Sequence, residues 1–184
     1  EKNLDKFLSD LRTNPPTLAR IDQIRVRKDQ INSYTQFKII SSQDESGQFI
    51  PISPDVSICS DCLKELFDPT NRRFRYPFIN CTNCGPRFSI IQKIPYDRPN
   101  TTMAAFDMCP DCQKEYDNPL DRRFHAQPVA CPQCGPQVWL ESDGQLLAKA
   151  EMAIQRARKW LAEGRIIALK GLGGFHLACD ARND

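Results

Sequence analysis

Eight of the nine cysteines in this chain of 184 residues lie in Cys-x-x-Cys pairs. Eighteen residues separate the first pair from the second, and the third and fourth pairs repeat this arrangement at an offset of fifty residues. The pairs are Cys59/Cys62, Cys81/Cys84, Cys109/Cys112 and Cys131/Cys134. A two-residue gap lets both sulfurs of a pair bind one ion from a tight turn, and the longer gap returns the second pair to it. The spacing predicts two structural zinc sites, because four sulfurs leave no position for an activated water.

The spacing leaves the assignment of pairs to ions open. We expect the first two pairs to share one ion and the last two another, whereas a crossed arrangement would join the outer pairs and the inner pairs. A disulfide framework is a competing interpretation, but thiols two residues apart are poorly placed to bridge each other. The sequence also shows no apolar secretory segment. A redox pair would need a single motif within a βαβ pattern, which is absent.

Residues other than cysteine keep the same offset, and this indicates a duplicated module. The matching positions are Asp61/Asp111, Lys64-Glu65/Lys114-Glu115, Pro69/Pro119, Arg72-Arg73-Phe74/Arg122-Arg123-Phe124 and Gly85-Pro86/Gly135-Pro136. The four arginines could line a path for an oxyanion, since guanidinium groups bind such groups bidentately. The alternative is a solvated turn whose phenylalanine packs against the metal site. We expect His125 to be a surface or hydrogen-bonded residue and not a ligand.

Composition favours a soluble, cytoplasmic protein. The chain is 40% hydrophobic and 26% charged, as in ordinary globular domains. No stretch reaches the roughly 18 apolar residues of a membrane span. Many of the fourteen prolines surround the cysteines, which predicts a turn-rich centre where metal substitutes for a large core. Between Asp55 and Leu140 ten basic residues balance ten acidic ones, which argues against a nucleic-acid-binding double zinc ribbon.

Incomplete α+β segments flank the tandem four-cysteine module, which we place at residues 48–140. In residues 1–47, Leu4, Phe7, Leu8 and Leu11 share one helical face, and Asn14-Pro15-Pro16 ends the helix. Strands are expected at residues 20–27 and 36–41, and a linker at residues 41–47. One helix and two strands cannot enclose a core, so these residues resemble the back half of a domain.

The last segment, residues 141–184, is also expected to be part of a larger domain. A helix is predicted over Gln145–Glu163, followed by a buried strand at residues 165–170, a glycine-rich turn and an apolar stretch at residues 175–179. Cys179 is expected to be a buried free thiol, and residues 180–184 could open another helix. We therefore expect the chain to be a piece of a longer protein. The turn is also a candidate phosphate contact, with a plain turn as the alternative; its residues are Lys170, Gly171, Gly173, Gly174 and His176.

Three stretches together carry a family resemblance. They are the run from Pro15 to Asp22 (PPTLARID), the doubled cysteine repeat with its Arg-Arg-Phe, and the run from Lys170 to Asp180 (KGLGGFHLACD). The chain closely resembles hydrogenase-maturation carbamoyltransferases of the HypF type. The resemblance implies part of an acylphosphatase-like domain, a double zinc-finger module and the start of a YrdC-like nucleotide-binding domain. For the nucleotide site it favours ATP binding by the glycine-rich turn.

The resemblance also implies an activity and partners for the longer protein. Such enzymes use carbamoyl phosphate and ATP, with Mg²⁺, to make a carbamoyl adenylate. They then carbamoylate the C-terminal cysteine of a partner maturation protein, and this group becomes a cyanide ligand of the nickel–iron centre. The acylphosphatase catalytic residues of the family would precede Glu1, so no catalytic residue is assigned here. A zinc-stabilised protein-interaction scaffold without chemistry remains the main alternative for this chain.

Overall fold

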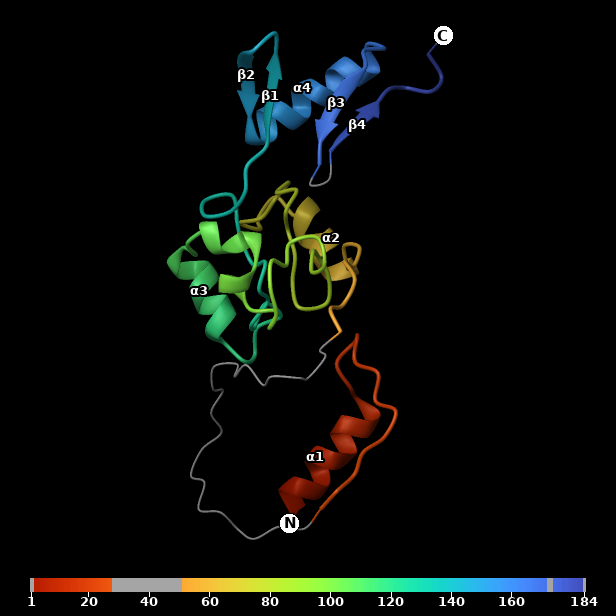
Figure 1. The fold of residues 1–184 in the computed structure, drawn as a ribbon, viewed down its shortest axis with the longest axis vertical. Helices are drawn as coiled ribbons and strands as arrows, with labels where there is room; N and C mark the ends of the chain where they lie inside the picture. The colour runs from red at the N-terminus through yellow and green to blue at the C-terminus, as the bar shows by residue number, and fades with distance from the viewer. Residues whose placement is uncertain (1, 28–50, 172–173, 184) are drawn as a thin grey trace. The chain divides into compact units, whose positions relative to one another are not determined.

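The computed structural model describes residues 2–27, 51–171 and 174–183 (Figure 1). The chain divides into two compact units, Glu1–Glu45 and Ser46–Asp184. The further boundary near residue 140 stays a prediction. In chain order, the elements of the described residues are α1 (Lys2–Thr13), α2 (Ser60–Phe67), the short 3-10 helices η1 (Arg98–Asn100) and η2 (Thr102–Ala105), α3 (Pro110–Asp117), β1 (Trp139–Ser142), β2 (Gln145–Lys149), α4 (Ala150–Ala162), β3 (Ile167–Lys170) and β4 (Phe175–Ala178).

The first unit confirms the predicted helix and its end. Helix α1 has Asp5 in its first turn and Arg12 in its last, which suits the helix dipole, and it stops just before the prolines. The strand predicted at residues 20–27 is wrong, since these residues have no regular structure. A strand forms only by pairing, and no described segment pairs with this one. The predicted strand at residues 36–41 and the linker at residues 41–47 lie outside the described residues.

The duplicated module of the second unit consists of two short helices and many turns. Helices α2 and α3 are each eight residues long and start at the first Cys-x-x-Cys pair of their repeat. A series of turns then leads to the second pair. The connection between the repeats contributes η1 and η2, where the buried Arg98 donates to the carbonyls of Gln127 and Val129. This contact ties the connection to the second repeat.

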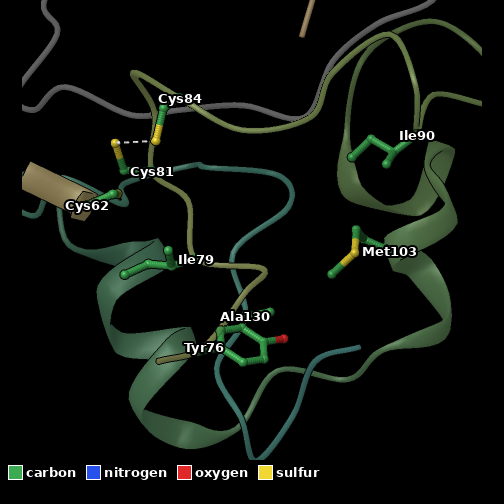
Figure 2. Packing of buried hydrophobic residues seen from close by; sticks show 8 residues of the cluster. All are labelled: Cys62, Tyr76, Ile79, Cys81, Cys84, Ile90, Met103 and Ala130. Atoms are coloured by element: carbon green, nitrogen blue, oxygen red, sulfur yellow. Dashed lines mark hydrogen bonds between the residues drawn. The ribbon is translucent and has the colours of Figure 1, made fainter. Parts of the chain in front are cut away.

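Cysteines make up much of the core of this module. One buried cluster joins Cys62, Cys81 and Cys84 to five other side chains, which are Tyr76, Ile79, Ile90, Met103 and Ala130 (Figure 2). A second cluster consists of Cys109, Cys112 and Cys131, with Met108 and Cys134 packed against it. So small an apolar interior indicates that the module depends on something other than a hydrophobic core.

The C-terminal region holds two antiparallel hairpins and a helix. Strand β1 pairs with β2, and β3 with β4, while α4 contacts β1, β2 and β3 (Figure 1). The predicted helix starts too early, because Gln145–Lys149 is strand β2. Asp143 has a φ of 53 and Gly144 a φ of 73 degrees, as in the two-residue turns that close hairpins. The Asp-Gly signal was present in the sequence and outweighs the helical periodicity of the residues after it.

Three further predictions for this region are wrong. Only Ile167 of strand β3 is buried, so the strand is not a buried one. Cys179 is free, as expected, but exposed. Residues 180–183 form a turn, closed by a hydrogen bond from the Asn183 N–H to the Asp180 carbonyl (3.1 Å), and not the start of a helix. Most of β3, Cys179 and residues 180–183 have too few described neighbours to be buried.

Candidate metal centres

Eight cysteine sulfurs gather into two groups that follow the chain order. Within each group the four sulfurs lie within 4.8 Å of one another. The groups are Cys59, Cys62, Cys81 and Cys84, and Cys109, Cys112, Cys131 and Cys134. We call them the first and second metal centres. The local assignment is therefore confirmed, and the crossed arrangement is wrong.

The spacing of the sulfurs fits a tetrahedral zinc ion. Sulfurs about 2.3 Å from a central zinc ion lie about 3.8 Å apart. The Sγ–Sγ distances are 3.7 Å from Cys59 to Cys81 and from Cys81 to Cys84, and 3.7 Å from Cys109 to Cys131. All nine cysteines lie in the described part of the chain, and none forms a disulfide. The disulfide interpretation is thus not supported, and both groups suit structural zinc.

Each centre combines a helix start with a tight turn. Cys59 and Cys109 are the residues that cap α2 and α3, and the Cys62 N–H donates to the Cys59 sulfur (3.4 Å). The N–H groups at a helix start favour thiolates. In the turn of the first centre the Asn83 N–H donates to the Cys81 sulfur (3.3 Å). Backbone donors therefore support the ligands of the first centre from both sides.

A glycine closes the turn of the first centre. Gly85 has a φ of +102 degrees, a backbone conformation that residues with a side chain rarely adopt. A Cβ atom at this position would lie 2.6 Å from the Asn80 Cβ, too close for any side chain. In the second repeat a Cβ atom on Gly135 would overlap the Tyr76 hydroxyl and the Ala130 Cβ. Glycine after the second cysteine pair thus has a steric reason in both repeats.

The paired arginines of each repeat lie on the metal centre of the other repeat. Arg72 Nη2 is 3.2 Å from the Cys112 sulfur and 2.7 Å from a Glu115 carboxylate oxygen. At the equivalent positions, Arg122 Nη1 is 2.9 Å from the Cys62 sulfur, and Arg122 Nη2 is 2.6 Å from a Glu65 oxygen. The two repeats therefore exchange their arginines.

The second arginine of each pair lies deeper. Arg73 is 1% exposed and Arg123 is 4% exposed. Arg73 Nε donates to the carbonyl of Ala130 (2.8 Å) while its Nη atoms bind Glu115, and Arg123 bonds in the same way to the Asn80 carbonyl and to Glu65. Each buried cation is thus paired, as burial requires.

These contacts correct both interpretations of the arginines. A solvated turn is wrong for Arg73 and Arg123, and so is an oxyanion path, because both side chains are buried and bound within the protein. Phe74 is half-buried, and the guanidinium carbon of Arg75 lies 5.1 Å from the centre of its ring. Phe74 belongs to neither cysteine cluster. His125 is exposed, which confirms the expected surface residue. Its ring lies tilted against Tyr116, at a ring-centroid distance of 4.8 Å, and meets Phe124 edge to face at 4.5 Å.

The electrostatics of the two glutamates follow from these ion pairs. Burial alone would raise the pKa of Glu115, but hydrogen bonds from Arg73 and Arg72 outweigh it and lower the pKa to about 2. Burial opposes the same effect at Glu65, whose pKa is lowered by Arg123 and Arg122. Both carboxylates are thus charged at neutral pH.

Glu65 and Glu115 had no role assigned from the sequence, although a signal was present. Each follows by three residues the cysteine that lies within its helix, Cys62 or Cys112, so the glutamate and that cysteine lie on one helical face. Lys64-Glu65 and Lys114-Glu115 are also among the positions that the repeat keeps. The charged partners of Glu115 are not near it in sequence, because they lie 42 or more residues away.

The candidate nucleotide residues lie in the β3–β4 hairpin. Lys170 pairs with Phe175 in the ladder, and its Nζ lies 5.2 Å from the centre of that ring. The Gly171 N–H donates to the Gly174 carbonyl (2.7 Å), and His176 faces Gly171 across the hairpin. Gly173 lies outside the described residues. The described residues thus form two paired strands, and their contact with a nucleotide stays a prediction.

None of the helices in the described part of the chain is both long and apolar enough to cross a membrane.

Comparisons with known proteins agree with the sequence pattern. The model of the HypF finger family matches residues 58–91 and 108–141, one match for each repeat. Over its whole length the chain is 52% identical to a probable carbamoyltransferase HypF of Methanocaldococcus jannaschii, of which it covers 24%. Over 98% of its length it is 56% identical to the carbamoyltransferase HypF of Synechocystis sp., again covering 24%.

Two solved structures are similar as well. A crystal structure of full-length HypF in a phosphate- and nucleotide-bound form matches 98% of this chain with a TM-score of 0.82 and 52% identity. The crystal structure of T. kodakarensis HypF matches all of it with a TM-score of 0.79 and 47% identity. The chain covers 23% of each of these structures, so it spans about a quarter of the length of the proteins that it matches.

Proposed function

Because this chain belongs to the HypF family, we propose that it is the zinc-binding part of an ATP-dependent carbamoyltransferase. Water hydrolyses carbamoyl phosphate to carbamate and phosphate. The carbamate then attacks the α-phosphorus of ATP and displaces pyrophosphate, so that the carbamoyl group is held as a carbamoyl adenylate. It then passes to the C-terminal cysteine of a partner protein in nickel–iron hydrogenase maturation. The observation that carries the proposal is the pair of four-sulfur centres within the two segments that match the HypF finger.

The proposed metal is zinc, one ion in each centre, with a structural role. Four thiolates fill the tetrahedron, so the ion supplies folding free energy and no activated water. In small zinc peptides this amounts to about 10 kcal/mol or more. We also propose a cytoplasmic location, because reduced thiols are maintained there.

The hairpin turn between β3 and β4 is proposed to contribute to the ATP site of the complete enzyme. Support comes from the family resemblance of the run Lys170–Asp180 and from the nucleotide bound in one similar structure. Lys170, Gly171, Gly173, Gly174 and His176 are the proposed contacts, and Mg²⁺ accompanies ATP. Replacing Lys170 by methionine is expected to raise the KM for ATP, with little effect on zinc content.

A nucleic-acid-binding function is less well supported. The sequence feature that suggested it was the presence of arginines beside aromatic residues. In the structure, the four arginines of the repeats bind glutamates and sulfurs of the protein itself. A scaffold without chemistry differs from the enzyme in one measurable way, because it predicts no adenylate formation.

The test is ATP–pyrophosphate exchange that depends on carbamoyl phosphate, measured in the full-length protein that carries this segment. Under reducing, zinc-replete conditions we expect exchange, and native mass spectrometry should find two zinc ions in this segment. A Cys81→Ser variant should lose one ion and stability, whereas Cys179→Ser should lose neither. Absence of exchange in the zinc-loaded protein would contradict the enzymatic proposal and leave the scaffold.

A further inference from the structure

The exchanged arginines lie beside the metal ligands and not only beside the glutamates. Arg72 Nη2 is 3.2 Å from the Cys112 sulfur, and Arg122 Nη1 is 2.9 Å from the Cys62 sulfur. Cys62 and Cys112 are both fully buried. A zinc ion with four thiolates carries a net charge of about −2. A buried centre of this charge needs nearby cations or N–H donors, and in each case the other repeat provides the cations.

The turn that carries each arginine pair is tied to the helix of its own repeat. In the first repeat the Arg75 N–H donates to the Leu66 carbonyl of α2 (2.8 Å), and in the second the His125 N–H donates to the Tyr116 carbonyl of α3 (3.0 Å). Both helices begin at a metal-binding cysteine. Metal at one centre therefore anchors a helix, the helix anchors a turn, and the turn places two guanidinium groups at the other centre.

We infer that the two metal centres are thermodynamically coupled, and that Arg72 and Arg122 are positioning residues that carry this coupling between the repeats. This inference rests on the zinc occupancy proposed above. Filling one centre raises the affinity of the other, and linkage makes the effect equal in both directions. Glu65 and Glu115 hold the arginines in place, since each binds both guanidinium groups of a pair.

The coupling has a structural asymmetry. The Thr82 N–H and Oγ1 both donate to the Arg122 carbonyl, at 3.2 and 3.0 Å, so the backbone of Arg122 is fixed to the turn of the first centre. The equivalent of Thr82 in the second repeat is Pro132, which has no N–H and no hydroxyl. Arg122 is thus held by its backbone and its side chain, and Arg72 by its side chain.

The first test replaces single arginines in the full chain. Arg72→Met is expected to speed zinc loss from the second centre about 10- to 100-fold, as for other residues that support metal ligands, and Arg122→Met should act on the first centre. Chelator competition followed by alkylation and peptide mass spectrometry identifies which cysteines lose metal. Arg75→Met is the matched control, because Arg75 lies in the same turn and binds Glu151.

A spectroscopic measurement separates support of the ligands from general stability. With ¹¹³Cd in both centres, Arg72→Met should shift the resonance of the second centre and leave that of the first in place. Arg72→Lys, which keeps a charged N–H donor, should restore part of the shift. Loss of metal from the first centre, the centre of the same repeat, while the second centre keeps its ion would overturn the inference.

The second test measures the coupling itself. Removing the first centre with Cys81→Ser and Cys84→Ser should lower the zinc affinity of the second at least about 10-fold. In the Arg72→Met background the same removal should have a smaller effect, and only the Arg122 contact and the contact of Arg73 with the Cys112 sulfur (3.4 Å) then remain to couple the centres. An equal fall in both backgrounds would refute the role of Arg72 as the carrier. Binding of fewer than two zinc ions by the unaltered chain would instead contradict the proposed metal occupancy.

Discussion

Replacement of Glu115 by glutamine should destabilise the zinc-loaded protein by about 3 kcal/mol. Glu115 is the carboxylate that binds Arg73, which is 1% exposed. Removing one partner of a buried ion pair costs about 3–5 kcal/mol, because a charge is left uncompensated. The low end applies here for two reasons. The Glu115 side chain is 20% exposed, and Arg73 keeps its hydrogen bond to the Ala130 carbonyl.

The assay is reversible urea unfolding at a fixed excess of zinc under reducing conditions, followed by circular dichroism. Glu151→Gln makes the same chemical change in the ion pair with Arg75, whose two side chains are 35% and 41% exposed. It should cost less than about 1 kcal/mol. The reasoning predicts that Glu115→Gln lowers the unfolding midpoint far more than this control does.

A double-mutant cycle with Arg73→Met sharpens the test. If Glu115 acts by compensating Arg73, replacing both residues should cost clearly less than the sum of the single replacements, with a coupling energy of about 1.5 kcal/mol or more. Additive effects, or a cost of Glu115→Gln no larger than that of Glu151→Gln, would refute the reasoning.

Three other outcomes follow from the geometry. Burial raises the pKa of Tyr96 to about 12, so the stability that this group contributes is complete below pH 10 and is lost as pH rises from 10 to 12. Burial also raises the pKa of Tyr76 and Tyr116, so absorbance spectroscopy of the tyrosinate band should show several late-titrating groups, and Tyr96→Phe should remove the one near pH 12. Gly85→Ala should cost about 2 kcal/mol or more from strain and overlap and weaken the first centre, since its Cβ would meet Asn80. At Gly144, where the space is open, alanine should cost about 1 kcal/mol from backbone strain alone. Equal costs of the two replacements in thermal unfolding would contradict the steric argument. In the zinc-loaded protein iodoacetamide should label Cys179 first, because it is exposed and outside both centres; rapid labelling of the other eight thiols would argue against bound metal.

The sequence by itself determined the metal ligands and favoured the grouping that the structure confirms. Two cysteines separated by two residues are close in space whatever the rest of the fold does, and eighteen residues of turns can return the second pair to the first. Helix α1 was equally local, since its apolar face and the prolines that end it are adjacent in the chain. Such features depend on short-range geometry, which spacing alone specifies.

Local patterns were misleading where a longer-range contact or a turn decides. The alternation at Ile24 and Val26 indicated a strand, but a strand needs a paired neighbour. The residues Gln145–Lys149 fit a helical stripe, yet the Asp143-Gly144 turn pairs them with β1. In both cases the periodicity of one segment carried no information on its partner.

Only the tertiary structure decided what the paired arginines do. Their sequence context allowed a solvated turn or an anion path, and the repeat pattern did not indicate that Arg72 and Arg73 belong to the centre of the second repeat. That choice depends on how two copies of one module pack, which places a guanidinium 40 residues from its sulfur in the sequence and 3.2 Å from it in space. Buried charges require partners, and here each repeat supplies two arginines to the glutamate and the cysteine cluster of the other.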